Sequence, residues 1–189
     1  MKLLALAAAI AGAAAGVGIA VARHGASAGP ALHAQATWSN KPAPPIALRD
    51  QGGARFSLAS LRGGTALLTF LDSRCRNECP IEGQALAAVE RRVRVPVVVV
   101  STDPWGDSTA TVTRFAAKER WSFPWHWLLG TRAQLRPIWK DYGVAVKRTP
   151  RDVLHTLALY VIDAHGDQRA AYLFPFSPGE VAADIRTLT

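Results

Sequence analysis

Residues 65–80 read TALLTFLDSRCRNECP, an apolar run followed by a polar segment that holds both cysteines of the chain. The run Thr65–Leu71 is almost continuously apolar, which is typical of a strand buried on both faces. Pro80 predicts a helix that continues to about Arg92, because proline is favoured at the first helical position. This stretch therefore predicts a buried strand, a short loop that carries two cysteines, and a helix.

Further strands and helices alternate on both sides of this stretch. We expect strands at 95–101, 154–162 and 168–174, helices at about 108–120 and 131–142, a closing helix from Ser177, and a hairpin formed by 46–48 and 55–58. Buried strands that alternate with helices predict an α/β fold, a mixed sheet flanked by helices. Residues 46–189 are expected to form a single domain.

The first residues have the features of an export signal. Met1 and Lys2 are followed by an uncharged run from Leu3 to Ala22, so residues 1–23 are interpreted as a membrane anchor or a signal segment. Residues 24–45 contain four prolines and are expected to form a Pro/Ala-rich linker. The remainder of the chain is then expected outside the cytoplasm, where disulfides persist.

The formal net charge of +8 raises the question of a nucleic-acid partner. Most of the basic residues are scattered singly, and the sequence has no zinc finger, RNP motif or glycine-rich phosphate loop. We therefore expect a solvated basic surface and no nucleic-acid binding. Attraction to anionic lipid headgroups or to an acidic partner protein stays open.

Cys75 and Cys79 lie four residues apart, with the second at the start of the predicted helix. This spacing would bring both sulfurs to one side of a helical turn, close enough for one metal or a disulfide. The helix N-terminus, Arg74 and Arg76 are expected to lower the thiol pKa. Three interpretations follow: a structural disulfide, a redox dithiol, or a metal site that would need a histidine as a further ligand.

The five histidines differ in their surroundings. His24 and His33 precede the expected domain, His165 lies in a polar turn, and His126 lies in an aromatic-rich stretch that suggests packing. His155 stands at the start of a predicted central strand, next to a polar loop. A polar ring at a strand end beside a loop is placed like a site residue.

Four blocks of the sequence resemble the Sco/SenC family of thioredoxin-like, copper-handling proteins tethered to energy-transducing membranes. The resemblance extends from about Ile46 to Leu188. The blocks, in order, are Cys75-x-x-x-Cys79-Pro80, Ser101-Thr102-Asp103-Pro104-x-x-Asp107-Ser108, Tyr142-Gly143-Val144 and His155-Thr156. The resemblance implies a thioredoxin-like sheet with an added N-terminal β-hairpin.

The resemblance also implies that Cys75, Cys79 and His155 bind one copper ion, as Cu(I), Cu(II) or both. Such proteins deliver copper to the dinuclear copper site of cytochrome c oxidase, or reduce its cysteines. The implied protein is a copper chaperone of the inner membrane with its soluble domain on the periplasmic side. Its implied partners are the copper-bearing oxidase subunit or another cuproprotein, and a periplasmic copper donor.

Between the cysteines the sequence departs from the family pattern. Arg76 and Asn77 stand where Pro-Asp is common, and Glu78 stands where an aliphatic residue is usual. The added cation should favour thiolates and disfavour a cationic metal. The alternative function is therefore a thiol–disulfide oxidoreductase in which one cysteine attacks a target disulfide and the other resolves it. Asp103 and Asp107 are expected to cap and brace the loop after the second buried strand.

Overall fold

The computed structural model describes residues 31–188, which form ten strands, four α-helices and one short 3-10 helix. The strands are β1 Ala36–Pro42, β2 Ala47–Arg49, β3 Arg55–Ser57, β4 Ala66–Leu71, β5 Val97–Ser101, β6 Trp125–Leu128, β7 Val146–Arg148, β8 Val153–His155, β9 Ala158–Ile162 and β10 Asp167–Leu173. The helices are η1 Leu58–Leu61, α1 Glu78–Val93, α2 Thr109–Lys118, α3 Arg132–Asp141 and α4 Pro178–Leu188.

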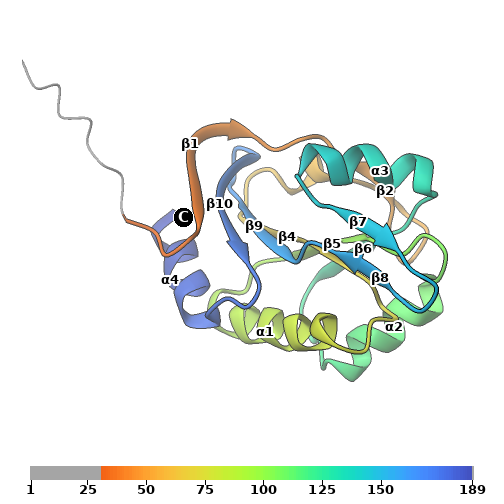
Figure 1. The fold of residues 1–189 in the computed structure, drawn as a ribbon. Coiled ribbons are helices and arrows are strands. Elements are labelled where there is room, and N and C mark those ends of the chain that lie inside the picture. Colours follow the sequence, from red (N-terminus) through yellow and green to blue (C-terminus); the bar gives the residue numbers. More distant parts are fainter. Residues whose placement is uncertain (1–30, 189) are drawn as a thin grey trace, which may run out of the picture.

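Six of the strands form one sheet in the order β1-β10-β9-β4-β5-β6. Strands β4, β5 and β6 are parallel, whereas β9 and β10 run antiparallel to their neighbours. The predicted mixed α/β sheet is confirmed, and so is the predicted hairpin, which forms the separate two-stranded sheet β2–β3. Figure 1 shows α1, α2 and α4 along one side of the large sheet, with α3 and the hairpin on the other.

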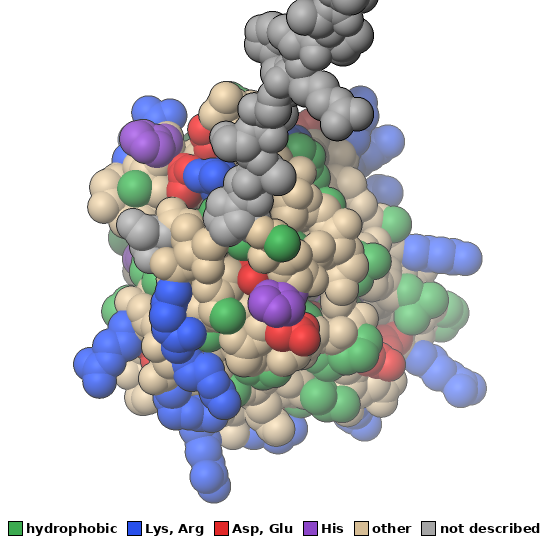
Figure 2. All heavy atoms as spheres, turned by 90° about the vertical axis from the view of Figure 1, so that its left-hand side faces the viewer, with side chains coloured by type: hydrophobic (Ala, Val, Ile, Leu, Met, Phe, Trp, Pro, Cys, Tyr) green, Lys and Arg blue, Asp and Glu red, His purple; other side chains and the backbone are tan. Residues whose placement is uncertain are grey.

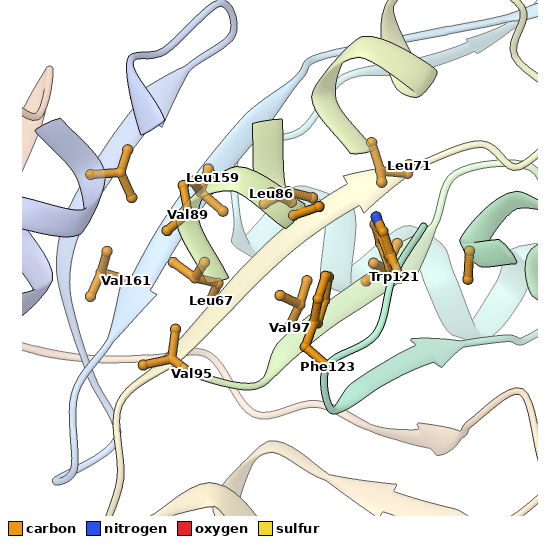
Figure 3. Close-up of a cluster of buried hydrophobic side chains, with 14 of the residues drawn as sticks. Leu67, Leu71, Leu86, Val89, Val95, Val97, Trp121, Phe123, Leu159 and Val161 are labelled. Atoms are coloured by element: carbon orange, nitrogen blue, oxygen red, sulfur yellow. The ribbon is translucent and has the colours of Figure 1, made fainter. Parts of the chain in front are cut away.

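Successive side chains of the central strands point to opposite faces of the sheet, and so contribute to two separate halves of the core. In β4, Leu67 and Leu71 face the layer of α1, α2 and α4, while Leu68 and Phe70 face the layer of α3 and the β2–β3 hairpin. All six residues of β4 are buried, as expected for a strand covered on both faces. Figure 3 shows the α1 side of this core, where Leu86 lies over the strands.

Two predicted boundaries were wrong. Helix α1 begins at Glu78, so Pro80 is its third residue; proline is tolerated there because the first-turn N–H groups have no intrahelical acceptor. The predicted strand 154–162 is divided into β8 and β9, because β8 turns away to pair with β7. His155 therefore ends a small hairpin strand and does not start a central one.

The expected linker also contains a strand. Within residues 24–45, β1 pairs antiparallel with β10 at the edge of the sheet, and nearby His33 places Nδ1 2.7 Å from Asp184 Oδ1 of α4. In Figure 2, which views this side of the molecule, basic side chains stand mainly around the margin. The interpretation of residues 1–23 lies outside the described residues. None of the helices within 31–188 is long and apolar enough to span a bilayer.

Candidate metal centre

Both cysteines lie where the parallel strands β4 and β5 end. The loop that follows β4 carries Cys75, and the first turn of α1 carries Cys79. The hairpin β7–β8 brings His155 to the same place from a distant part of the chain. The carboxyl ends of parallel strands are the usual position of a site in a sheet of this kind.

The three candidate ligands are close together. Cys79 Sγ lies 3.4 Å from His155 Nε2, and Cys75 is close enough to Cys79 for each thiol to shift the pKa of the other. Both cysteines are free thiols; Cys79 is fully buried and Cys75 is half-buried. The spacing argument predicted this proximity for the wrong reason, because Cys75 precedes the helix and does not share a helical turn with Cys79.

The backbone fixes the orientation and the tautomer of His155. Its Nδ1 lies 3.1 Å from the carbonyl oxygen of Thr156, which can only accept a hydrogen bond, so Nδ1 carries the proton. The lone pair is then on Nε2, the atom that faces Cys79. Burial lowers the pKa of His155, which keeps the ring neutral near pH 7. A neutral imidazole whose second nitrogen is held by a hydrogen bond is the form that binds metals.

The two thiols have opposite acidities. Hydrogen bonds from the Cys79 thiol and from the backbone N–H groups of Cys79 and Asn77 lower the pKa of Cys75 to about 6, although burial opposes them. The pKa of Cys79 is raised above its ordinary value, because its thiol donates a hydrogen bond to Cys75 and because it is buried. The N–H groups at the start of α1 therefore lower the pKa of Cys75, as predicted. Arg74 and Arg76, which were also expected to lower it, are not among the causes of the shift. Cys75 is the thiolate at neutral pH, and Cys79 is its proton donor.

Asp107 links the end of β5 and the loop after it to the loop after β4 through hydrogen bonds. Its carboxylate accepts hydrogen bonds from the Ser73 N–H and hydroxyl, at 3.0 and 2.5 Å, and from the Ser101 hydroxyl at 2.6 Å. Asp103 accepts the Trp105 N–H at 3.1 Å within the second loop. The predicted bracing role of both aspartates is confirmed. Asp107 thereby fixes the loop that carries Cys75, and Asp103 braces the loop after β5.

Sequence reasoning missed the buried carboxyl group of Glu82. It lies three residues after Cys79 on the inner face of α1 and is fully buried. Its Oε1 is 2.6 Å from the Thr69 hydroxyl, Oε2 has no hydrogen-bond partner, and burial raises its pKa to about 7. Helical periodicity from Cys79 through residues 82, 83 and 86 would have shown that this position faces the core.

The other histidines that the structure describes lie apart from the sulfurs. His126 contacts Asp50 at 3.3 Å and stacks on Phe56, in agreement with its predicted packing role. His165 is exposed in the turn before β10, and His33 contacts Asp184. Two sulfurs and one neutral imidazole are a donor set suited to copper: thiolates favour Cu(I), and the added nitrogen also allows Cu(II).

The chain is similar in sequence to the proteins of one family. Residues 35–189 match the SCO1/SenC family model. The chain is 25% identical to the SCO1 protein homolog of Bacillus subtilis over 132 residues, which are 65% of this chain and 68% of that protein.

Solved structures share the fold. Bradyrhizobium japonicum ScoI, whose structure has copper bound, is 26% identical with a TM-score of 0.67, over 78% of this chain and 99% of that one. BsSco, a member of the Sco family of cytochrome c oxidase assembly proteins in which a disulfide switch was identified, is 20% identical with a TM-score of 0.69, over 82% of this chain and 96% of that one. The sheet order, the cysteine pair at the mouth of α1 and the family match together establish that this chain belongs to the SCO1/SenC family.

Proposed function

We propose that this protein is a membrane-tethered copper chaperone that carries one copper ion on Cys75, Cys79 and His155 and delivers it to the dinuclear copper site of cytochrome c oxidase. The observation that carries the proposal is the 3.4 Å contact between Cys79 Sγ and the unprotonated Nε2 of His155, next to the Cys75 thiolate. The tether is residues 1–23, and the domain faces the periplasm. Two findings support copper as the metal that this chain carries: its membership of the family, and the copper bound in the structure of B. japonicum ScoI.

The environment of the site suits a carrier that must release its metal. Cys75 is half-buried at the surface, whereas Cys79 is enclosed. An incoming thiolate can therefore approach copper from the Cys75 side, and His155 lies on a hairpin outside the main sheet. The Cys75 thiolate that copper needs is stabilised by the Cys79 thiol and by backbone N–H groups, and does not depend on Arg76.

The test is an anaerobic copper titration of the reduced full-length chain, with a competing chelator. Wild type should bind one equivalent tightly, and Cys75→Ser, Cys79→Ser and His155→Ala should each lower the affinity by more than about 100-fold. His165→Ala is the matched control, because His165 is exposed in a turn away from the sulfurs and should leave the affinity unchanged. Equal affinity in wild type and the two cysteine variants would exclude the proposed carrier site. Cells that lack the chain should contain oxidase depleted of its dinuclear copper.

The low pKa of Cys75 favours one second candidate, a thiol–disulfide oxidoreductase. In that reaction the Cys75 thiolate attacks a target disulfide and forms a mixed disulfide, with release of the first target thiol. Cys79 then attacks Cys75, which releases the second target thiol and leaves an oxidised Cys75–Cys79 pair. His155→Ala separates the two functions, because exchange should persist in this variant while copper carriage is lost.

A further inference from the structure

The fold gathers basic residues that are scattered along the sequence. A groove of about 750 Å³ opens beside Cys75, and six exposed cationic side chains line it. They come from the loop after β4, from α2 and from the β7–β8 hairpin: Arg74, Arg76, Arg114, Lys118, Arg148 and Arg151. One of them, Arg76, is part of the departure from the family pattern.

Acidic side chains do not balance this charge. Three carboxyl groups line the same groove, from Asp72, Asp103 and Asp152. The first two are almost fully buried, and Asp103 is already 4.0 Å from Arg74. The groove therefore presents a surplus of positive charge to solvent, with the reactive sulfur of Cys75 in its lining.

Exposed apolar side chains accompany the cations. Trp105 lines the groove, is 40% exposed and stacks against Arg148 at 4.7 Å. Ile81 is 57% exposed two residues after Cys79, and Leu154 is 56% exposed next to His155. Arginine and tryptophan are enriched at protein interfaces, so Trp105 and its arginine neighbours are typical of a surface that binds another protein.

We propose that this groove docks an acidic, extended segment of a partner protein and so brings the partner's thiols to Cys75. The proposal rests on the function proposed above and specifies its partner: a protein whose thiols or copper-binding residues lie beside a run of Asp and Glu. Attraction between the two charged surfaces would speed the encounter and orient the segment, and the apolar residues would hold it.

The test uses copper-free, reduced full-length chain, so its result does not depend on copper binding. Three peptides carry one cysteine as a mixed disulfide with thionitrobenzoate, flanked by four Glu, four Gln or four Lys. The Cys75 thiolate attacks the peptide sulfur, a Cys75–peptide disulfide forms, and thionitrobenzoate leaves with the electron pair of the broken bond. At low salt the Glu peptide should react at least about tenfold faster than the Gln peptide, and the ratio should fall as salt is added.

A triple variant, Arg76→Gln, Arg114→Gln and Arg151→Gln, should reduce the Glu/Gln rate ratio to about threefold or less. The matched control is Arg55→Gln, Arg132→Gln and Arg136→Gln, which removes the same charge from exposed positions outside the groove and should keep the ratio. Using the ratio cancels any change in the acidity of Cys75, and thermal melts check that each variant is folded.

Three outcomes would overturn the proposal: a Glu/Gln ratio near one in wild type, an equal loss of the ratio in both triple variants, or an equal preference for a small anion. The last arm compares oxidised glutathione with hydroxyethyl disulfide. If that pair shows the same ratio as the peptides, the groove recognises a small anion and not a polypeptide segment. A failure here leaves the copper titration unaffected, so the two proposals fail separately.

Discussion

Glu82 is a residue whose burial has a direct consequence for stability. Within residues 31–188 its carboxyl group has no cation among its hydrogen-bond partners, and one oxygen has no partner; its pKa is raised to about 7 from an ordinary value of 4.5. The protonated form fits the site best, because its O–H can donate to the Thr69 hydroxyl, which in turn donates to the Ala158 carbonyl at 3.1 Å. Ionised Glu82 would be a buried charge without compensation.

The first prediction concerns the pH dependence of this residue. Because the folded pKa is above the unfolded one, the folded state binds more protons between about pH 4.5 and pH 7, and the free energy of unfolding falls as pH rises through that window. Glu82→Gln keeps the shape and hydrogen bonds of the neutral acid. It should be close to wild type at pH 4.5 and more stable at pH 8, by up to roughly 3 kcal/mol.

Urea denaturation at several pH values measures this difference. Asp72 and Asp107 also have raised pKa values, so the wild-type profile contains their contributions. Subtracting the variant's free energy of unfolding from that of wild type at each pH leaves the contribution of Glu82. A difference that does not vary with pH would mean that Glu82 is ionised in the folded protein.

The second prediction concerns the protons that copper displaces. Above pH 7 the Cys75 thiol, with its pKa of about 6, is already ionised, and His155, with its lowered pKa, is already neutral. Cys79 keeps its proton, because its pKa is raised. Copper binding at pH 7.5 should therefore release about one proton, and more than one at pH 5, where Cys75 is also protonated.

Calorimetric titrations in buffers of different ionisation enthalpy count these protons. The affinity should fall as pH drops below the pKa of Cys75, because protons then compete for that sulfur as well. Release of two protons at pH 7.5 would show that Cys75 is a thiol in the free protein, against the hydrogen bonding described above.

At the scale of elements, α1 closely approaches α2 and the segment that follows it at Gly83. Gly83 allows this approach, because a Cβ atom at this position would lie 3.0 Å from the Phe115 ring. The Gly83 carbonyl also accepts a hydrogen bond from the Trp121 indole N–H at 2.9 Å. A side chain at this position must push α1 and α2 apart or rotate a buried ring.

The third prediction follows from this packing. Gly83→Val should lower the free energy of unfolding by about 1–3 kcal/mol, although valine has a higher helix propensity than glycine. Ala85→Val, two residues further along the same helix and half-buried, is the matched control and should change stability little. Chemical denaturation of both variants measures the difference. Equal stability would mean that α1 and α2 can separate at no cost.

The elements also show how far the sequence could be interpreted. Uninterrupted apolar runs predicted β4 and β5 correctly, since burial on both faces leaves a strong pattern. The short strands β6, β7 and β8 have no such pattern; they exist because β5 or a hairpin partner offers hydrogen bonds. The sequence predicted Cys75, Cys79 and His155 as one group, but the tautomer of His155 depends on a carbonyl group that no sequence pattern indicates.

At the scale of the whole molecule, the N-terminal edge of the sheet is supplied by a segment that looks like a linker. Prolines and small residues suggest an extended tether, yet β1 pairs with β10 and covers what would otherwise be an open edge. His33, just before β1, contacts the buried carboxyl group of Asp184, which also accepts the Tyr172 hydroxyl at 2.5 Å. The predicted linker therefore supplies the strand farthest from β6 in the sheet.

The fourth prediction tests whether β1 is part of the folding unit. A chain of residues 43–189 lacks β1 and His33, whereas a chain of residues 31–189 keeps both and serves as the control. The shorter chain should lose at least about 2 kcal/mol of unfolding free energy, because the β10 backbone groups lose their partners. It should also associate as its concentration rises, because the exposed edge of β10 can pair with another molecule. Urea denaturation and sedimentation measure the two effects. If both chains are equally stable and monomeric, residues 36–42 act only as a tether, and the domain proper begins at the β2–β3 hairpin.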